Sequence, residues 1–324
     1  MANNKNPYVA PELWLPYAQE AMIYYNNVVG LLADVDPTPP STEGELLKMP
    51  YQSAIDNIGD VTQIVEDTTT VTPSIPADVN VYVPIMHYGA GITSSQYMSL
   101  ARGADPVVQL GQYLGGYWSL QIQKKVKLIL NTQFEASGAL RGTPEKHYKN
   151  SADPLTSDDI FDAKAEFGDD YGSMSTMIMH PKALAKFMKD YTTSSWSASE
   201  LTNNILSTGT VQRWNGLNII TSEMLCPAWD DSGTDKYPTY IISGKPLYMA
   251  VMTPLYEEKQ KKADTGGSTT EYYYYTRVAL GLKGVSYTSS TIPATDTTLA
   301  TVGSWTKKWD DRNIKVYRID TPLA

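Results

Sequence analysis

A run of about thirty residues with helical periodicity, from Asp105 to Phe134, constrains the fold of this 324-residue chain more than any other feature. Asp105 and Pro106 form a favourable start, because an acidic residue followed by proline suits the first turn of a helix. Apolar residues recur at the spacing of one helix face, namely Val107, Leu110, Leu114, Tyr117, Trp118, Ile122, Val126, Ile129, Leu130 and Phe134. Such a helix is about 45 Å long, far above the average of about 11 to 12 residues.

Three glycines, Gly111, Gly115 and Gly116, lie inside this predicted helix. Each costs up to about 1 kcal/mol relative to alanine unless close packing offsets the loss. Two interpretations stay open. The glycines weaken one turn so that the helix can bend in a conformational transition, or they let a neighbouring strand pack closely against the helix.

The chain before the long helix divides into an arm, a linker and a loop. From Pro11 to Leu32 apolar residues recur at helical spacing. Three prolines in the segment from Asp36 to Glu43 favour an extended linker, so the N-terminus is expected to form an arm rather than part of a compact core. From Lys48 to Val83 the pattern predicts a long polar hairpin. Its tip, near Asp56 to Thr70, has too few bulky apolar residues for a core of its own and needs support from a neighbour.

The chain after the long helix begins as an α/β region, from Asp153 to Ile242. A helix is predicted at 157–167, a buried strand at 174–179, a second helix at 181–190 and a hairpin at Asn215-Gly216. β patterns then dominate, at 240–242, 247–252, 272–282 and 314–319. The sequence Lys259–Lys262, with Gly266-Gly267, predicts a solvated hairpin tip.

Charge and composition exclude several classes of protein. The 26 Lys and Arg residues against 35 Asp and Glu residues give a net charge of −9, which disfavours a dedicated DNA-binding or lipid-binding protein. Cys226 is the single cysteine, so neither an intramolecular disulfide nor a cysteine metal cluster can form. No signal-peptide core, membrane-length apolar run or glycosylation sequon occurs, so we expect a soluble protein made in the cytosol. The 23 tyrosines suit either extensive contact surfaces or a solvated β surface.

The sequence offers no motif for catalysis or for a cofactor. His87, His147 and His180 are far apart in sequence, and His180 is expected to end a strand with its imidazole hydrogen-bonded. Neither a nucleophile elbow nor a phosphate loop occurs. The stretch Gly89–Ser94 begins like a dinucleotide fingerprint but has serine where the third glycine belongs.

Four pairs of adjacent aspartates could in principle serve hydrolysis or bind Ca²⁺. They are Asp158-Asp159, Asp169-Asp170, Asp230-Asp231 and Asp310-Asp311. Thr156 lies three residues before Asp159, which predicts a helix cap with acidic charge at the positive helix end. The second and third pairs adjoin glycines in predicted turns, where aspartate accepts local backbone hydrogen bonds. We therefore expect no catalytic site and no metal site.

The order of predicted elements is helical arm, proline linker, long β loop, very long helix, α/β insert and strands that return to the helix. This order resembles the HK97-like major capsid proteins of tailed double-stranded DNA bacteriophages over essentially the whole chain. The stretches that are similar to that family are Pro11–Trp14, Gly59-Asp60 with its threonine-rich run, Val81–Val83, Gly103–Pro106, Ile160–Ala163, Phe167–Asp169, Met177–Pro181, Trp214–Ile220 and Leu299-Ala300 with Trp305.

The resemblance implies an α+β HK97-like capsid fold with five parts. These are an N-terminal arm at 1–47, an extended β-hairpin loop (E-loop) at 48–90, a peripheral domain with the long spine helix and a β-sheet at 91–152, an α/β axial domain at 153–252, and a C-terminal return to the peripheral domain at 253–324.

The implied function is structural rather than enzymatic. Copies of the chain would assemble as hexamers and pentamers into an icosahedral head that encloses double-stranded DNA without sequence-specific binding, with no cofactor and no membrane. The implied partners besides other copies are a separate scaffolding protein, a portal protein at one vertex and a decoration protein. Assembly would take place in the host cytoplasm, and the final location would be the capsid of the virion.

An arm and a loop without support of their own gain stability by lying across neighbouring subunits. Inter-subunit contacts are therefore expected at Trp14, Tyr17, Asp60, Glu66, Asp67 and Thr70. Because the arm begins near residue 10, scaffolding is expected to be separate or missing, and no N-terminal maturation cleavage is expected. The loop from Asp56 to Pro76 contains no lysine, so the lysine–asparagine cross-link of some family members is expected to be missing.

Three alternatives stay open at this point. An encapsulin-like nanocompartment shares the fold and would load cargo enzymes instead of DNA. A β-rich hydrolase or binding module would need two of the paired acids to converge in a cleft. A tail or decoration protein is also a virion component, but would not ordinarily require a long helix beside an α/β insert.

Overall fold

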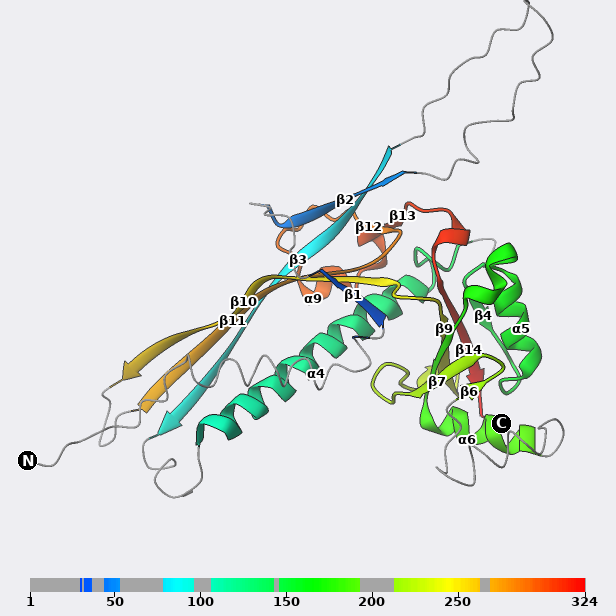
Figure 1. Cartoon of the computed structure of the whole chain (residues 1–324), viewed down its shortest axis with the longest axis horizontal. Helices are drawn as coiled ribbons and strands as arrows, with labels where there is room; N and C mark the ends of the chain where they lie inside the picture. The colour runs from blue at the N-terminus through cyan, green and yellow to red at the C-terminus, as the bar shows by residue number, and fades with distance from the viewer. Residues whose placement is uncertain are drawn as a thin grey trace, which may run out of the picture.

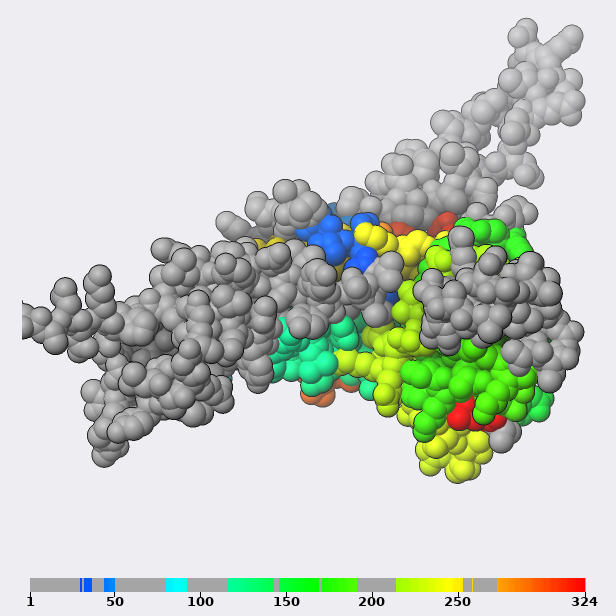
Figure 2. Space-filling model, turned by 60° about the horizontal axis from the view of Figure 1, so that its bottom comes forward, coloured from blue at the N-terminus to red at the C-terminus, as the bar shows by residue number. Residues whose placement is uncertain are grey.

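The computed structural model describes residues 30, 32–36, 44–52, 78–95, 106–142, 146–192, 213–262 and 269–323. The long strands β3, β10 and β11 run beside the long helix α4, and helices α5 and α6 lie around a second sheet at one end of the molecule (Figure 1). In the space-filling view this end forms a rounded lobe (Figure 2). Within the described ranges no helix is long and apolar enough to span a membrane.

Five strands form the first sheet, in the spatial order β1–β10–β11–β3–β2. Their bounds are Ala33–Asp36 for β1, Leu247–Lys262 for β10, Thr269–Leu282 for β11, Asp78–Ser95 for β3 and Leu46–Gln52 for β2. β1 runs parallel to β10, and the other pairs are antiparallel. Because side chains alternate between the faces of a strand, Met86 and Val278 join the core that α4 covers, whereas Ile85 and Ala279 join a smaller cluster.

Helix α4 (Pro106–Phe134) is 29 residues long, and its bounds confirm the prediction from the sequence. It continues without a break through Gly111, Gly115 and Gly116, so the glycines do not end it. Its second half supplies buried side chains to the largest core cluster, namely Ile122, Val126, Ile129, Leu130 and Phe134. Each such side chain contributes about 1.5–3 kcal/mol when fully buried, so the apolar stripe fixes this half of the helix to the sheets.

The second sheet has seven strands, in the order β4–β14–β9–β5–β7–β6, with β8 also paired to β9. The bounds are Tyr148–Asn150 for β4, Val316–Pro322 for β14, Thr234–Ile242 for β9, Thr176–Met179 for β5, Leu217–Thr221 for β7, Arg213–Trp214 for β6 and Trp229–Asp231 for β8. Tyr240 and Val316 lie in the cluster shared with α4. Ile241 and Tyr317 lie in a second cluster with residues of α5 (Ser157–Ala165) and α6 (Pro181–Thr192). Alternation along the strands therefore gives this sheet two covered faces.

Three local predictions in this region are confirmed. Thr156 caps α5, because its hydroxyl accepts from the Asp159 backbone N–H while the Asp159 carboxylate accepts from the Thr156 backbone N–H. Asn215 and Gly216 join β6 to β7 with φ angles of 45° and 78°, as the predicted tight turn requires. β5 ends at Met179, directly before His180.

The C-terminal part of the chain adds short elements beside α4. They are β12 (Val285–Tyr287), the short helix α9 (Asp296–Leu299), β13 (Trp305–Lys307) and the 3₁₀ helices η5 (Val302–Ser304) and η6 (Asp311–Asn313). A further 3₁₀ helix, η3 (Gly168–Ser173), lies between α5 and β5 in the α/β region. β12 pairs with β13. Trp305 packs edge-on against Tyr287, with ring centroids 5.3 Å apart, and donates its indole N–H to the Leu299 carbonyl at 3.0 Å. These contacts fix α9 to the core.

The base of the N-terminal arm differs from the expectation of a segment outside the core. Leu32 and Ala33 are buried in the main cluster, and residues 33–36 form edge strand β1. The pairing was missed because a four-residue parallel edge strand has too little sequence for periodicity to show. The rest of the predicted arm helix, from Pro11 to 29, lies outside the described residues, as does the loop tip from 53 to 77.

Two strands pair differently from the sequence-based division of the chain. Residues 247–252, grouped with the α/β region, begin β10 in the five-stranded sheet. Residues 316–322, grouped with the return to the peripheral part, form β14 in the seven-stranded sheet. Strand pairing between segments so far apart in the chain leaves no local signal.

The Gly89–Ser94 stretch lies inside β3 and not in a loop before a helix, which is incompatible with a dinucleotide fingerprint.

Candidate functional site

The acid pairs do not converge in the part of the chain that the structure describes, where no group of three His, Cys, Asp or Glu side chains could hold a metal ion. Asp159 pairs with Lys149 at 2.8 Å, and Asp230 accepts from the Gly233 backbone N–H at 2.7 Å in a turn. Asp311 pairs with Lys307 at 2.6 Å. Asp169 and Asp170 belong to η3, and their side chains are not described. Each described pair thus has a structural partner of its own.

The three histidines contact different partners. His87 lies 2.6 Å from Glu45, and His147 lies 3.2 Å from Asp311. The His180 ring accepts a hydrogen bond from the Lys182 backbone N–H at 3.0 Å, which confirms the expected hydrogen-bonded imidazole at the end of the strand. Burial lowers the pKa of both His147 and His180.

The base of the arm is fixed by polar contacts on β1. Lys283 pairs with Asp34 at 2.8 Å, and this hydrogen bond holds the pKa of the Asp34 carboxyl below its usual range. The Tyr248 hydroxyl donates to Asp36 at 3.0 Å. Burial together with the Asp36 carboxylate raises the pKa of Tyr248 to about 12. These contacts therefore add to the pairing that holds β1 against β10.

The base of the β2–β3 hairpin is fixed by Glu45, just before β2. Its carboxylate contacts His87 of β3 at 2.6 Å and Arg277 of β11 at 3.7 Å. Its carbonyl accepts from the Ile85 backbone N–H at 2.9 Å. On the other side of β3, the Tyr82 backbone N–H donates to the Ser286 hydroxyl at 3.0 Å. The base of the β2–β3 hairpin is thus connected by polar contacts both to β11 and to Ser286.

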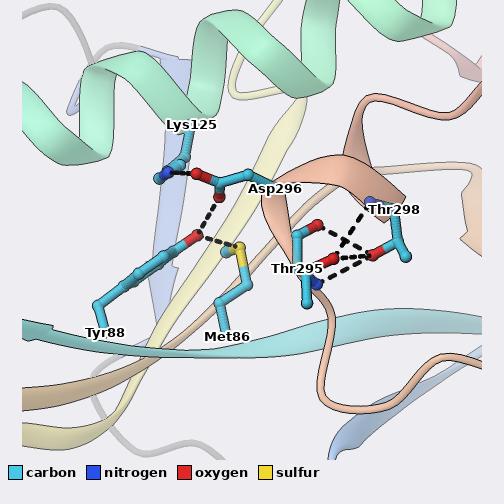
Figure 3. Close-up of polar contacts among 6 residues, drawn as sticks. All are labelled: Met86, Tyr88, Lys125, Thr295, Asp296 and Thr298. Atoms are coloured by element: carbon cyan, nitrogen blue, oxygen red, sulfur yellow. Dashed lines mark hydrogen bonds and ion pairs between the residues drawn. The ribbon is translucent and has the colours of Figure 1, made fainter.

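A polar cluster joins β3 to α4 and α9 (Figure 3). Lys125 of α4 pairs with Asp296, the first residue of α9. Lys125 Nζ also lies 4.9 Å from the centre of the Tyr88 ring, within the range of a cation–π contact. The Tyr88 hydroxyl donates to Met86 Sδ at 2.9 Å and approaches Asp296 Oδ1 at 3.5 Å. Burial, reinforced by the Asp296 charge, raises the pKa of Tyr88.

A second, buried cluster joins the C-terminal end of α4 to the seven-stranded sheet. Arg318 of β14 donates to Asp320 at 2.8 Å, and Tyr148 of β4 donates to the same carboxylate at 2.9 Å. The Arg318 guanidinium lies 6.0 Å from the Phe134 ring centre. The Tyr240 hydroxyl donates to Asn131 of α4 at 3.0 Å. A cation beside the last turn of α4 is also favourable to the helix dipole.

The residues that the sequence singled out for inter-subunit contact, Trp14, Tyr17, Asp60, Glu66, Asp67 and Thr70, all lie outside the described residues. The sequence-based reasoning missed Lys125, Asp296, Arg318 and Asp320. A signal existed only for the last two, because residues at i and i+2 of a strand share a face. Lys125 and Asp296 are 171 positions apart in the sequence, so no local pattern connects them.

Comparison with known proteins connects this architecture to virus shells. No protein-family model matches the chain. The major capsid protein of Bacillus phage SPP1 is 22% identical over 323 residues, which cover 95% of this chain and 94% of that protein. Among solved structures, the capsid of cyanophage Pam1 matches with a TM-score of 0.61 at 9% identity, over 90% of this chain and 89% of that one. The chain has the HK97-like fold of phage capsid proteins.

Two further capsid structures have the same fold. The capsid of Ralstonia phage GP4 matches with a TM-score of 0.58 at 11% identity, over 90% of this chain and 87% of that one. The capsid of an empty GTA particle matches with a TM-score of 0.55 at 12% identity, over 92% and 90% of the two chains. The clusters at Lys125 and Arg318 therefore connect elements of a fold that this chain shares with those capsid structures.

Proposed function

We propose that this capsid protein builds the icosahedral head of a tailed phage from copies of itself, arranged as hexamers and pentamers around double-stranded DNA. The similarity to the SPP1 major capsid protein over 95% of the chain carries this proposal. The role is structural and not enzymatic, and the protein's location is the virion capsid. Assembly takes place in the host cytoplasm, without a cofactor and without a membrane.

The way in which the arm and the E-loop are attached to the subunit supports assembly. The arm leaves from β1 and the E-loop from the β2–β3 hairpin, and polar contacts brace both bases. A segment anchored at its base but too poor in apolar residues for its own core is stabilised by lying on another copy. We place contacts between subunits at Trp14, Tyr17, Asp60, Glu66, Asp67 and Thr70.

The five-part division expected from the sequence gives the proposed roles of the regions. The arm and the E-loop bind neighbouring copies, the peripheral domain with α4 forms the wall, and the α/β axial domain lies at the centre of each hexamer or pentamer. The proposed partners are a separate scaffolding protein, a portal protein at one vertex and a decoration protein. A net charge of −9 suits a container, because a lining that bound phosphate tightly would resist movement of the DNA.

The assembly state of the purified protein tests this function. Light scattering on a sizing column, followed by negative-stain electron microscopy of the leading peak, should show closed angular shells or six-fold rings. Co-expression with the neighbouring genes supplies a scaffolding protein if one is required. A stable monomer of 35.8 kDa under both conditions would contradict the proposal.

The proposed E-loop contacts have a test of their own. Replacement of Asp60, Glu66 and Asp67 together by lysine should prevent shell formation, because three reversed charges would face the neighbouring subunit. The matched control is Asp153→Lys, which reverses one exposed acidic residue on the described surface. Shells from the triple variant with the yield of the natural protein would remove these residues from the interface.

A further inference from the structure

The polar cluster in Figure 3 connects three elements through one lysine side chain. Lys125 leaves α4 and pairs with Asp296 of α9 while its ammonium group lies over the Tyr88 ring of β3. The Lys125 side chain is 14% exposed and that of Asp296 is 58% exposed. The ammonium group is thus held between a ring face and a carboxylate that water can still reach.

The position of Asp296 is set by the turn to which it belongs. Thr295 caps α9, and its hydroxyl accepts from the Thr298 backbone N–H while the Thr298 hydroxyl accepts from the Thr295 backbone N–H. Leu299 is completely buried and its carbonyl accepts from the Trp305 indole. Asp296 is therefore presented from a fixed support, from which it contacts Lys125 of α4 and Tyr88 of β3.

Helix α4 is held differently at its two polar clusters. Its C-terminal end contacts the Arg318–Asp320 pair, whose side chains are 8% and 1% exposed. Across the ranges that the structure describes, Lys125–Asp296 is the one ion pair that α4 makes. An exposed pair is weakened by salt, whereas a buried pair is screened much less. Of the two polar clusters, the one between α4 and β3 is therefore the weaker, and it adds to the apolar packing of Met86 in the core that α4 covers.

The strand at this contact is also the strand that carries the E-loop. β3 is continuous from Asp78 to Ser95, and Tyr88 lies near its middle. Its first residues, from Asp78 to Pro84, pair with β2 to form the hairpin. A change in the angle between β3 and α4 at Tyr88 therefore swings the hairpin as a lever, because the strand has no break between them.

We propose that Lys125 and Asp296 form a latch that holds β3 at a fixed angle to α4, and that this angle sets the curvature of the shell. The second half of the proposal rests on the proposed function. In a closed symmetric shell each copy meets its neighbours at fixed angles, so a change of hairpin direction in every subunit changes the curvature of the whole. Lys125 and Asp296 are thus positioning residues that act through β3.

The test compares four variants with the natural protein. Lys125→Met removes the charge but keeps the length of the side chain, and Asp296→Asn keeps the shape of the acid. The double variant Lys125→Asp with Asp296→Lys restores a pair with the charges exchanged. Lys186→Met is the matched control, because Lys186 pairs with Asp190 at 3.3 Å within α6 and joins no two elements.

Two measurements test whether the Lys125–Asp296 pair holds β3 and sets the curvature of the shell. Cryo-electron microscopy gives the distribution of shell diameters, and hydrogen exchange of the unassembled chain gives the exchange rates of β3 amides. Lys125→Met and Asp296→Asn should broaden the diameter distribution and accelerate β3 exchange about three-fold or more, because the strand opens more often. The exchanged pair should restore both values toward those of the natural protein, and Lys186→Met should change neither. Salt at about 1 M should reproduce the effect in the natural protein.

The outcomes separate the two proposals. Unchanged diameters and unchanged β3 exchange in both single variants would overturn the latch while the assembly function stands. Changed exchange with unchanged diameters would overturn the link to curvature. If the natural protein forms no shells, the assembly function fails, and the exchange rates alone decide whether the latch exists.

Discussion

Arg318 donates to Asp320 at a distance of 2.8 Å, and the two side chains are 8% and 1% exposed to solvent. Tyr148 completes the arrangement by donating to the second carboxylate oxygen. A buried ion pair is costly to desolvate, so what decides its value is whether each charge keeps its partner. Here one carboxylate has both a cation and a hydroxyl, and the cation lies against the last turn of α4 through Phe134.

Breaking this pair should strongly destabilise the subunit. Arg318→Met leaves the Asp320 carboxylate buried without its cation, which we expect to lower the free energy of unfolding by about 3–5 kcal/mol. Urea unfolding followed by circular dichroism measures the loss. The control is the double variant Arg318→Met with Asp320→Leu, which removes both charges and should recover most of the stability. A loss below about 1 kcal/mol in the single variant would show that the pair does not hold this joint.

The turn after α4 depends on one glycine. A Cβ at Gly138 would lie 2.3 Å from the Gln133 carbonyl oxygen, which accepts the Leu140 backbone N–H. Gly138→Ala should therefore lower the free energy of unfolding by about 2–3 kcal/mol, because backbone atoms must move apart. Gly142→Ala is the control, since nothing lies within 4 Å of its added Cβ. Equal urea midpoints for the two variants would contradict the prediction.

The sequence predicted those elements that depend on residues close to one another in the chain. The bounds of α4 follow from an apolar stripe and a proline start, and the Thr156–Asp159 cap and the Asn215-Gly216 turn follow from side chains within four residues of one another. These signals survive without tertiary context because the contacts that cause them are formed within one turn of the chain.

The sequence could not predict contacts whose partners are distant in the chain. Lys125 finds Asp296 across 171 residues, and β1 pairs with β10 across more than 200. Gly89 shows the same limit in another form. It begins a stretch that only partly matches a dinucleotide fingerprint, and in the structure it lies opposite Tyr275, whose ring is 3.1 Å from the position of a Cβ at that glycine. Only the strand pairing reveals that reason for the glycine.

The cap of α5 should contribute measurably to the free energy of unfolding. Thr156→Ala removes the acceptor for the Asp159 backbone N–H and the hydroxyl that donates to the Asp159 carboxylate at 2.7 Å. We expect a loss of about 1 kcal/mol in the free energy of unfolding. Thr156→Ser keeps the hydroxyl and should stay close to the natural protein. A serine variant as unstable as the alanine variant would assign the loss to the methyl group and not to the cap.

The start of α6 should make the stability of this protein depend on pH. The His180 ring accepts from the Lys182 backbone N–H at 3.0 Å, so the neutral imidazole is the form that caps the helix. Burial lowers the pKa of His180, and the charge of Lys182 lowers it further, although Glu223 acts in the opposite direction. In the unfolded chain a histidine has a pKa of about 6.5.

The sign of the effect follows from this difference in pKa. As the pH falls through about 6.5, the unfolded chain binds a proton that the folded protein does not, so the free energy of unfolding decreases. Above that pH the contribution is constant. His180→Asn keeps a cap acceptor that does not titrate. Above pH 7 the free energy of unfolding of this variant should therefore differ from that of the natural protein by a constant amount. Between pH 7 and pH 5, a window set by the unfolded pKa of about 6.5, the variant should lose less stability than the natural protein. His147 titrates in both proteins and cancels in the comparison. Urea midpoints measured across this range would contradict the assignment if the two curves ran parallel.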